Sequence, residues 1–179
     1  NKNLKAYKPE IILSADLFGY SALGIDTGIG QCIESIGDNF EYVSFMVYPS
    51  HYYSGFFLKA VPEKNLPEIN FNVHQARSNP GVVVERSLRY ARDFFDGLIA
   101  TTTIKVSTTT PPAPPVKQSK ACNRPWLEDF YHEDDKAAGR PYGVEKVRIE
   151  IDAAERVDKC GWMLWNAANV YTEGALRAN

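Results

Sequence analysis

The sequence lacks most of the motifs that mark common catalytic and nucleotide-binding folds. It has no Gly-x-Ser-x-Gly element, no His-Glu-x-x-His zinc motif and no Cys-x-x-Cys pair. The segment Gly28-Ile29-Gly30 lacks the third glycine and the strand-to-helix spacing of a phosphate-binding loop. These absences argue against a serine hydrolase of the nucleophile-elbow type, a zinc enzyme and a nucleotide-binding protein. The sequence therefore implies neither a cofactor nor a metal.

An excess of charge of one sign is also missing. The formal net charge is −2, and lysine and arginine are scattered along the chain, which gives no electrostatic case for nucleic acid or an anionic membrane surface. No apolar run approaches the roughly 18 residues of a membrane span. The 179 residues, of which 44% are hydrophobic, suit one domain with a core of its own, spanning residues 1–179.

Cysteine is scarce, and its three copies leave one out of any pairing. Cys122 and Cys160 both lie near the starts of predicted strands, so a bridge between adjacent strands is one interpretation. Buried free thiols are the commoner state and the one that we favour for all three residues, Cys32 included. Cysteine usage therefore does not fix the cellular compartment.

What the sequence does contain is a pattern that occurs four times. Each unit has a short apolar run, then aromatic, polar and Gly or Pro residues, then usually a helical pattern. The predicted strands and the clusters that follow them lie within residues 11–20, 42–51, 122–130 and 160–166. The predicted helices begin near Asp26, run from an Asn79 cap through Phe95, cover 143–159, and start a short tail near Thr172. A long loop is expected after the second strand. Strands alternating with helices predict right-handed crossovers and a parallel sheet.

Four such units are half of a (β/α)8 barrel. A four-stranded parallel sheet leaves two exposed edges unless it is extended or paired. Because the chain also opens without methionine, we expect a preceding half-barrel or a second copy of the chain to complete it. An open four-stranded α/β layer is the alternative. Residues 101–118 are rich in threonine and proline, which predicts an extended loop inserted on the face away from the chemistry.

Strand alternation sorts the side chains of these units into two faces. Ligands of parallel α/β folds bind at the carboxyl ends of the strands. The face expected to pack on helices carries Ala15, Leu17, Val43, Phe45, Val47, Pro125, Leu127, Trp162 and Leu164. The face expected to look into the barrel carries Ser14, Asp16, Phe18, Ser44, Met46, Tyr48, Arg124, Trp126, Glu128, Gly161, Met163 and Trp165. This second face is polar and aromatic, so it is the predicted functional face.

The carboxylates on this face suggest acid–base chemistry. Asp16 ends the first strand, and Glu128 and Asp129 end the third. Only one of two adjacent strand residues can point inward, and parity favours Glu128, which leaves Asp129 on the rim or paired structurally. Glycoside hydrolysis needs two carboxyl groups, about 5–5.5 Å apart for retention or about 6.5–9.5 Å for inversion. Trp126 and Trp165 either stack on sugar faces or are large core residues.

Four motifs, in order, carry a family resemblance. They are Ser14-Ala15-Asp16-Leu17-Phe18-Gly19-Tyr20, Met46-Val47-Tyr48-Pro49-Ser50-His51-Tyr52, Arg124-Pro125-Trp126-Leu127-Glu128-Asp129-Phe130 and Gly161-Trp162-Met163-Leu164-Trp165-Asn166. They resemble a bacterial family that is assigned to the glycoside hydrolases largely by its barrel fold. Tyr142-Gly143, with Glu145, Val147 and Arg148, looks like the last helix of that family. Apart from the Thr/Pro-rich segment, the resemblance runs from about Pro9 to Leu176.

The resemblance implies that these strands are the fifth to eighth of a TIM-type barrel. An Asp-rich fourth strand would then lie outside this chain. The pairs Met46-x-Tyr48 and Met163-x-Trp165 are also similar to the sixth and eighth strands of chitinase-type barrels, where such residues line the sugar subsite. Pro49 stands where those enzymes have an aspartate. Relatives often have glutamine at the position of Glu128, which favours Asp16 or Asp129 as the catalytic acid.

The sequence therefore predicts the C-terminal half of an α/β barrel that hydrolyses a poly- or oligosaccharide. The catalytic candidates are Asp16, Asp129 and Glu128. The substrate-binding candidates are Tyr20, Met46, Tyr48, His51, Trp126, Trp165 and Asn166. The alternative is a non-catalytic module that binds a carbohydrate or the cell wall. A half-barrel without any pocket would be inactive.

Overall fold

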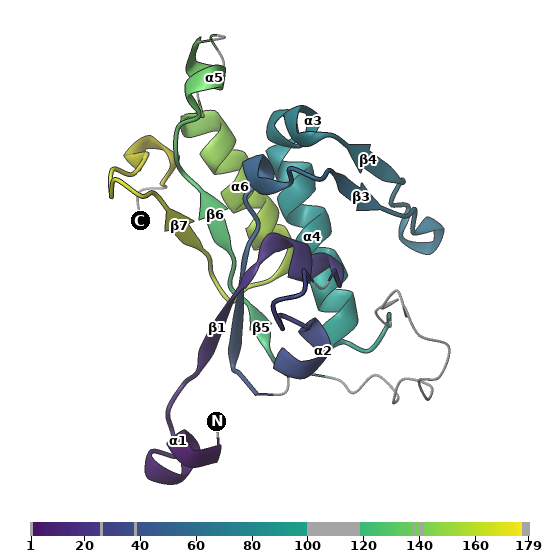
Figure 1. Ribbon diagram of the computed structural model, residues 1–179, viewed down its shortest axis with the longest axis vertical. Coiled ribbons are helices and arrows are strands. Elements are labelled where there is room, and N and C mark those ends of the chain that lie inside the picture. Colours follow the sequence, from purple (N-terminus) through teal and green to yellow (C-terminus); the bar gives the residue numbers. More distant parts are fainter. Residues whose placement is uncertain are drawn as a thin grey trace.

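The computed structural model is an α/β fold built on one parallel sheet (Figure 1). It describes residues 2–25, 27–37, 39–99, 119–137, 139 and 142–176, so the Thr/Pro-rich segment 101–118 lies outside the described residues. The strands follow the order β1 (Ser14–Phe18), β2 (Tyr42–Met46), β6 (Trp126–Glu128) and β7 (Met163–Trp165), and β5 (Cys122–Asn123) also pairs with β2. Every pairing in this sheet is parallel, as the sequence predicted.

One face of the sheet is apolar and buried. Leu17, Val43, Phe45, Val47 and Leu127 form a single core with the helices that cover this face. Alternate residues of a strand point to opposite faces of the sheet. Asp16, Trp126 and Trp165 alternate with residues of the apolar face, so they lie on the other face. The predicted helix-facing set is therefore confirmed for these strands. Each fully buried aliphatic or aromatic side chain contributes about 1.5–3 kcal/mol.

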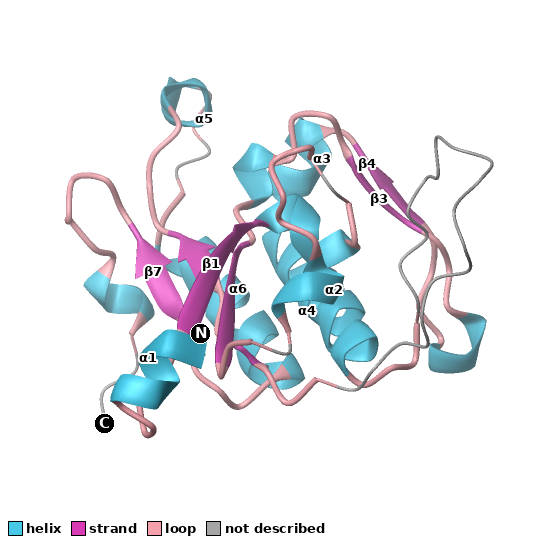
Figure 2. Ribbon diagram, turned by 60° about the horizontal axis from the view of Figure 1, so that its bottom comes forward, coloured by secondary structure: helices cyan, strands magenta, loops and turns pink. Residues whose placement is uncertain are grey.

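Two long helices, α4 (Pro80–Phe95) and α6 (Val144–Val157), lie against each other on that apolar face (Figure 2). The sequence predicted both. Val84, Leu88 and Ala91 recur at helical spacing and are fully buried, and Pro80 occupies the first turn, where it lacks no needed hydrogen bond. Asn79 occupies the N-cap position, as predicted, but its side chain makes no capping hydrogen bond and donates its amide to the carbonyl oxygen of Gln75 instead.

Two predicted elements are shorter in the structure. The helix expected from Asp26 is reduced to α2 (Ile33–Ile36), since Gly28 and Gly30 adopt positive φ angles of 80° and 77°. The third strand is divided into β5 and β6 by Arg124 and Pro125. Proline has no amide to donate to a neighbouring strand, so the hydrogen-bonded ladder is interrupted there.

The segment after β2, which the sequence predicted as a long loop, has structure of its own. It forms an antiparallel hairpin of β3 (Phe56–Leu58) and β4 (Ile69–Phe71), followed by α3 (Val73–Ser78). A capping box between Asn72 and Gln75 starts α3. Tyr52, Phe56 and Val83 belong to a second apolar cluster that attaches this segment to α4. The segment is therefore an ordered substructure that packs on α4 beside the strand ends.

The remaining elements are short. They are α1 (Lys2–Tyr7), α5 (Glu133–Ala137) and the 3-10 helices η1 (Gly19–Leu23), η2 (Pro49–His51), η3 (Pro62–Lys64) and η4 (Glu173–Ala175). The helical tail predicted from Thr172 is thus a single 3-10 turn. Within the described ranges, β1 and β7 each pair on one side only. None of the helices in those ranges combines the length and the apolar character that crossing a bilayer requires.

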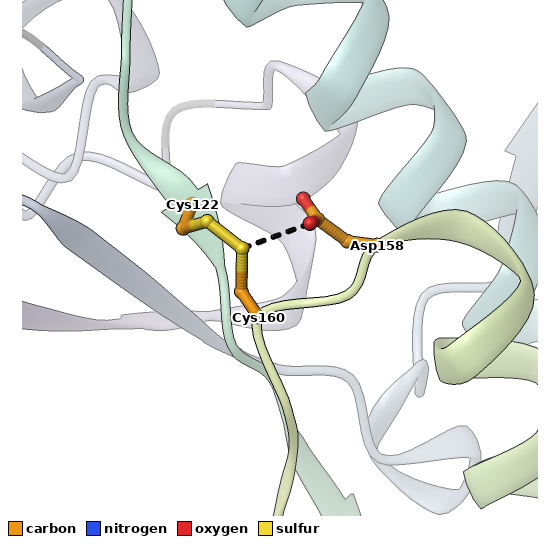
Figure 3. Close-up of side chains that lie close together, drawn as sticks. All are labelled: Cys122, Asp158 and Cys160. Carbon is orange, nitrogen blue, oxygen red and sulfur yellow. Dashed lines mark hydrogen bonds between the residues drawn. A yellow bond between two sulfur atoms is a disulfide. The ribbon is translucent and has the colours of Figure 1, made fainter.

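A disulfide joins Cys122 of β5 to Cys160, just before β7 (Figure 3). Their Cα atoms are 5.9 Å apart, within the usual range for a bridge. The preference for free thiols is therefore wrong for this pair, because two strand starts that are distant in sequence are neighbours in the sheet. Cys32 takes no part in the bridge.

Removing this bridge is expected to lower the free energy of unfolding by about 2 to 4 kcal/mol, because the two cysteines lie 38 positions apart and the bridge restricts the unfolded chain. Urea denaturation of the Cys122→Ser/Cys160→Ser double variant measures this. The control Cys32→Ser should change the value by less than about 1 kcal/mol. Equal midpoints for the two variants would contradict the prediction.

Candidate active site

A cavity of about 610 Å³ opens at the carboxyl ends of β1, β2 and β7, where Trp126 of β6 also lines it. Its volume lies within the range of about 300–1,000 Å³ that is usual for small-molecule sites. The described residues that line it are Asp16, Phe18, Gly19, Tyr20, Thr27, Ile29, Met46, Tyr48, His51, Tyr52, Trp126 and Trp165. The structure therefore brings together seven sequence-predicted residues, namely Asp16, Tyr20, Met46, Tyr48, His51, Trp126 and Trp165.

Asp16 projects from β1 into this cavity. It pairs in the sheet with Ser44 and is exposed to solvent. Its Oδ1 atom accepts a hydrogen bond of 3.1 Å from the indole nitrogen of Trp126, two strands away. Oδ2 has no hydrogen-bond partner among the described residues. Asp16 is thus an oriented carboxylate with one oxygen open to the cavity.

Two tryptophans form the wall next to Asp16. The rings of Trp126 and Trp165 meet edge to face, with centroids 6.1 Å apart and planes at 86°. Trp165 is 45% exposed, and Phe18, which also lines the cavity, is 49% exposed. The interpretation of Trp126 and Trp165 as core residues is therefore wrong: they present aromatic surface to the cavity, where C–H faces of a sugar could stack.

Tyr48 and His51 form the polar part of the lining. The ring of Tyr48 meets His51 and Phe130 edge to face, at centroid distances of 5.1 and 5.6 Å. Burial, followed by the negative charges of Asp16 and Glu128, raises the pKa of Tyr48, so its hydroxyl stays protonated. Partial burial lowers the pKa of His51, so its imidazole is neutral at pH 7. Both side chains can therefore hydrogen-bond to hydroxyl groups without carrying charge.

Gly19 and Tyr20 shape the cavity rim. A β-carbon at position 19 would lie 2.6 Å from the carbonyl oxygen of Met46 and 2.8 Å from the hydroxyl of Tyr52, so only glycine fits there. The hydroxyl of Tyr20 accepts from the backbone N–H of Ser54 and donates to the carbonyl of Gly55. Tyr20 thus ties the end of β1 to the hairpin segment.

Glu128 does not line the cavity, although it ends β6. Its side chain is fully buried. One carboxylate oxygen accepts the N–H of Ser50 at 3.0 Å, and the other lies 2.6 Å from Nε2 of His132. This places Glu128 behind the 3-10 turn that carries His51. Its contacts with Ser50 and His132 position the turn that forms part of the cavity wall.

A second buried carboxylate, Glu150 of α6, joins this cluster. Its Oε2 accepts the backbone N–H of Glu128 at 3.0 Å, and its Oε1 accepts the hydroxyl of Tyr142. Burial raises the pKa of Glu150 well above its ordinary value of 4.5, and the negative charge of Glu128 raises it further. Glu150 was not predicted from the sequence. The sequence signal that could have identified it is an acidic residue on the apolar face of the helix, beside Val147 and Ile151.

The Glu150→Gln variant is expected to gain stability over the parent as pH rises. A carboxyl with a raised folded pKa stabilises the fold fully below its unfolded pKa, near 4.5, and that contribution is lost as pH rises through the folded pKa. The variant lacks this titration, so its stability relative to the parent should rise between pH 4 and pH 8. Denaturation at several pH values tests this. Glu145→Gln, on an exposed face of α6, should show no such trend.

Asp129 also faces away from the cavity. Its side-chain oxygens accept the N–H and the hydroxyl of Thr172, at 2.8 and 2.6 Å. The side-chain amide of Asn166 donates to the carbonyl oxygen of Asp129. Asp129 and Asn166 therefore hold the segment after β7. Of the two alternatives for Asp129, the structure has the structural pairing.

A family model described as "Putative glycosyl hydrolase domain" matches residues 1–171. The chain belongs to this family. No curated protein and no solved structure matches the chain. Membership implies a carbohydrate as the substrate class, in agreement with the resemblance of the four motifs.

One group of described residues brings metal-ligating atoms together, at the opposite end of the strands from the cavity. Cys122, Asp158 and Cys160 place one such atom each within 4.8 Å of one another, and Sγ of Cys160 lies 2.9 Å from Asp158 (Figure 3). The two sulfur atoms are bonded to each other. A disulfide has no thiolate to bind a metal, so this group is not a metal centre in this state.

Proposed function

We propose that this chain supplies the sugar-binding wall and one catalytic carboxylate, Asp16, of a glycoside hydrolase cleft. The observation that carries the proposal is the cavity at the strand ends, in which Asp16 lies beside Trp126 and Trp165. Membership of the glycosyl hydrolase family supports it independently. In this arrangement the ring faces hold a pyranose, and Asp16 acts on the glycosidic bond.

Asp16 would act as an ionised carboxylate, either attacking the anomeric carbon or activating a water. The indole N–H of Trp126 fixes its Oδ1 atom, which leaves Oδ2 for the reaction. The protonated hydroxyl of Tyr48 and the neutral imidazole of His51 would bind hydroxyl groups near the cleaved bond. The described lining supplies every group that these roles require except a second acid.

Glycoside hydrolysis requires that second carboxyl group. Asp16 is the one carboxylate among the described residues of the lining, since Glu128 and Asp129 are engaged elsewhere. We assign Glu128 and Asp129 positioning roles. The second acid then comes from a part of the cleft outside the described residues, in keeping with the Asp-rich fourth strand that the resemblance implies.

The proposed cleft belongs to a (β/α)8 barrel in which β1, β2, β6 and β7 are the fifth to eighth strands. Three features support this: the strands are all parallel, the helices lie on one face, and the other face is polar and aromatic. The edges of β1 and β7 would pair with four further strands, from elsewhere in the polypeptide or from a second copy.

A non-catalytic saccharide-binding module is the second candidate. The single carboxylate in the described lining favours it, because an aromatic cavity without an acid pair can bind a sugar and not cleave it. Turnover by the full-length protein separates the two candidates. Saccharide binding without turnover, under conditions where the protein is folded, would favour the module.

If the protein is an enzyme, it should release shorter products from a panel of oligosaccharides, and mass spectrometry detects these products. Trp165→Ala should raise the dissociation constant of the bound oligosaccharide about tenfold, the value of roughly 1.4 kcal/mol of stacking. Val144→Ala, an exposed apolar residue on the helix layer, is the control and should leave it unchanged. If neither variant alters binding, the aromatic wall is not the sugar site.

A further inference from the structure

The cavity has a one-sided charge distribution. Asp16 contributes a carboxylate, and none of the described residues that line the cavity is a lysine or an arginine. Glu128 lies behind the wall, where it is paired with His132, and it acts on Tyr48 together with Asp16. Aromatic rings fill most of the remaining surface, and their faces carry partial negative charge.

The titratable groups of the lining itself do not offset the charge of Asp16. Tyr48 and His51 are both neutral at pH 7, for the reasons of burial given above. Behind the wall, burial raises the pKa of Glu150 from the helix layer, and His132 pairs with Glu128, with Nε2 and Oε1 2.6 Å apart. His132 and Arg77 of α3 both act on His51 as positive charges, and neither of them lines the cavity. Asp16 is therefore the group that sets the charge of the described lining, and this charge is negative.

From this arrangement we infer that the cleft selects saccharides that carry free, protonated amino groups, the chemistry of unacetylated hexosamine polymers. An ammonium group gains from the carboxylate of Asp16 and from the aromatic faces of Trp126 and Trp165. An N-acetyl group has no charge and gains neither. A uronate or a sulfated sugar is repelled by the same carboxylate. The inference rests on the proposed function and specifies the substrate class of the same site.

The test compares oligosaccharides of equal length and different charge on the full-length protein. Glucosamine oligomers, their N-acetylated forms and oligogalacturonates are titrated calorimetrically at mildly acidic pH and low salt. We expect the glucosamine oligomer to bind about tenfold more tightly than the acetylated one, and the galacturonate to bind most weakly. High salt should reduce this preference, because it screens exposed charges.

Variants locate the origin of the preference. Asp16→Asn keeps an oxygen that can accept the indole N–H of Trp126, and it removes the charge. It should bring the glucosamine and acetylated oligomers within about threefold of each other. Glu145→Gln removes an exposed charge on the opposite side of the sheet and should preserve the full preference. A preference that survives Asp16→Asn overturns the inference.

Two further outcomes are distinguishable. If neutral or uronate oligomers bind as tightly as the amino sugar, or are cleaved as fast, the charge selection is wrong and the glycoside hydrolase proposal stands. If no oligomer of any charge binds the protein, the proposed function fails, and the charge selection fails with it.

Discussion

Replacing Asp16 by asparagine is expected to lower kcat for glycoside hydrolysis by about 10²–10⁴-fold, the usual contribution of a carboxylate that takes part in the bond-breaking step. The affinity for a neutral oligosaccharide should change by less than about threefold, because most of the binding surface is aromatic. The variant retains the shape of the side chain and an acceptor for the N–H of Trp126. Steady-state kinetics and calorimetry on the full-length protein separate the two effects.

Asp129→Asn is the matched control for this prediction. Its oxygens are bound by the N–H and hydroxyl of Thr172, and the amide keeps one acceptor for them. We expect turnover to fall less than about tenfold and the melting temperature to drop, since a charge-assisted hydrogen bond is weakened. The opposite pattern, with Asp129→Asn inactive and Asp16→Asn active, would assign the catalytic carboxylate to Asp129 and contradict the role proposed for Asp16.

Replacing Glu128 by alanine is expected to lower the free energy of unfolding by about 3–5 kcal/mol, the usual loss when one partner of a buried pair is removed. The substitution leaves the N–H of Ser50 and the ring of His132 without their acceptor, and it opens a void beside Glu150. The 3-10 turn that carries His51 would lose its anchor. Urea denaturation of the variant measures the loss.

Glu128→Gln tests the same position without creating a void. It keeps an oxygen for the N–H of Ser50 and should cost about 1–2 kcal/mol, with turnover within about tenfold of the parent. This result would mark Glu128 as a positioning residue. A fully stable Glu128→Gln variant that has lost turnover by the same factor as Asp16→Asn would instead place Glu128 in the chemistry.

The elements with a strong apolar period were predictable from the sequence. The stripe of Val84, Leu88 and Ala91 located α4, and the alternation of Val43, Phe45 and Val47 assigned the buried face of β2. From that face the sequence also placed Asp16, Tyr48 and Trp126 around one cavity. These predictions depend only on local geometry, which repeats every two residues in a strand and every 3.6 in a helix.

The features that the sequence did not reveal depend on partners that are distant in the chain. Asp129 finds its partner in Thr172, and Cys122 finds Cys160, only once β6 and β7 are neighbours. The hairpin of β3 and β4 has three residues in each strand, too few to show alternation. The burial of Glu150 was not predicted, because a glutamate in a helix is usually on the surface.

The central claim is that a sugar binds between Asp16 and the two tryptophans at the strand ends. A crystal structure of the full-length Asp16→Asn protein with a bound oligosaccharide tests this most directly. The account predicts a pyranose ring in the cavity, with its face against Trp126 or Trp165 and its glycosidic oxygen near the side chain at position 16. A saccharide bound at another surface, with this cavity empty, would contradict it.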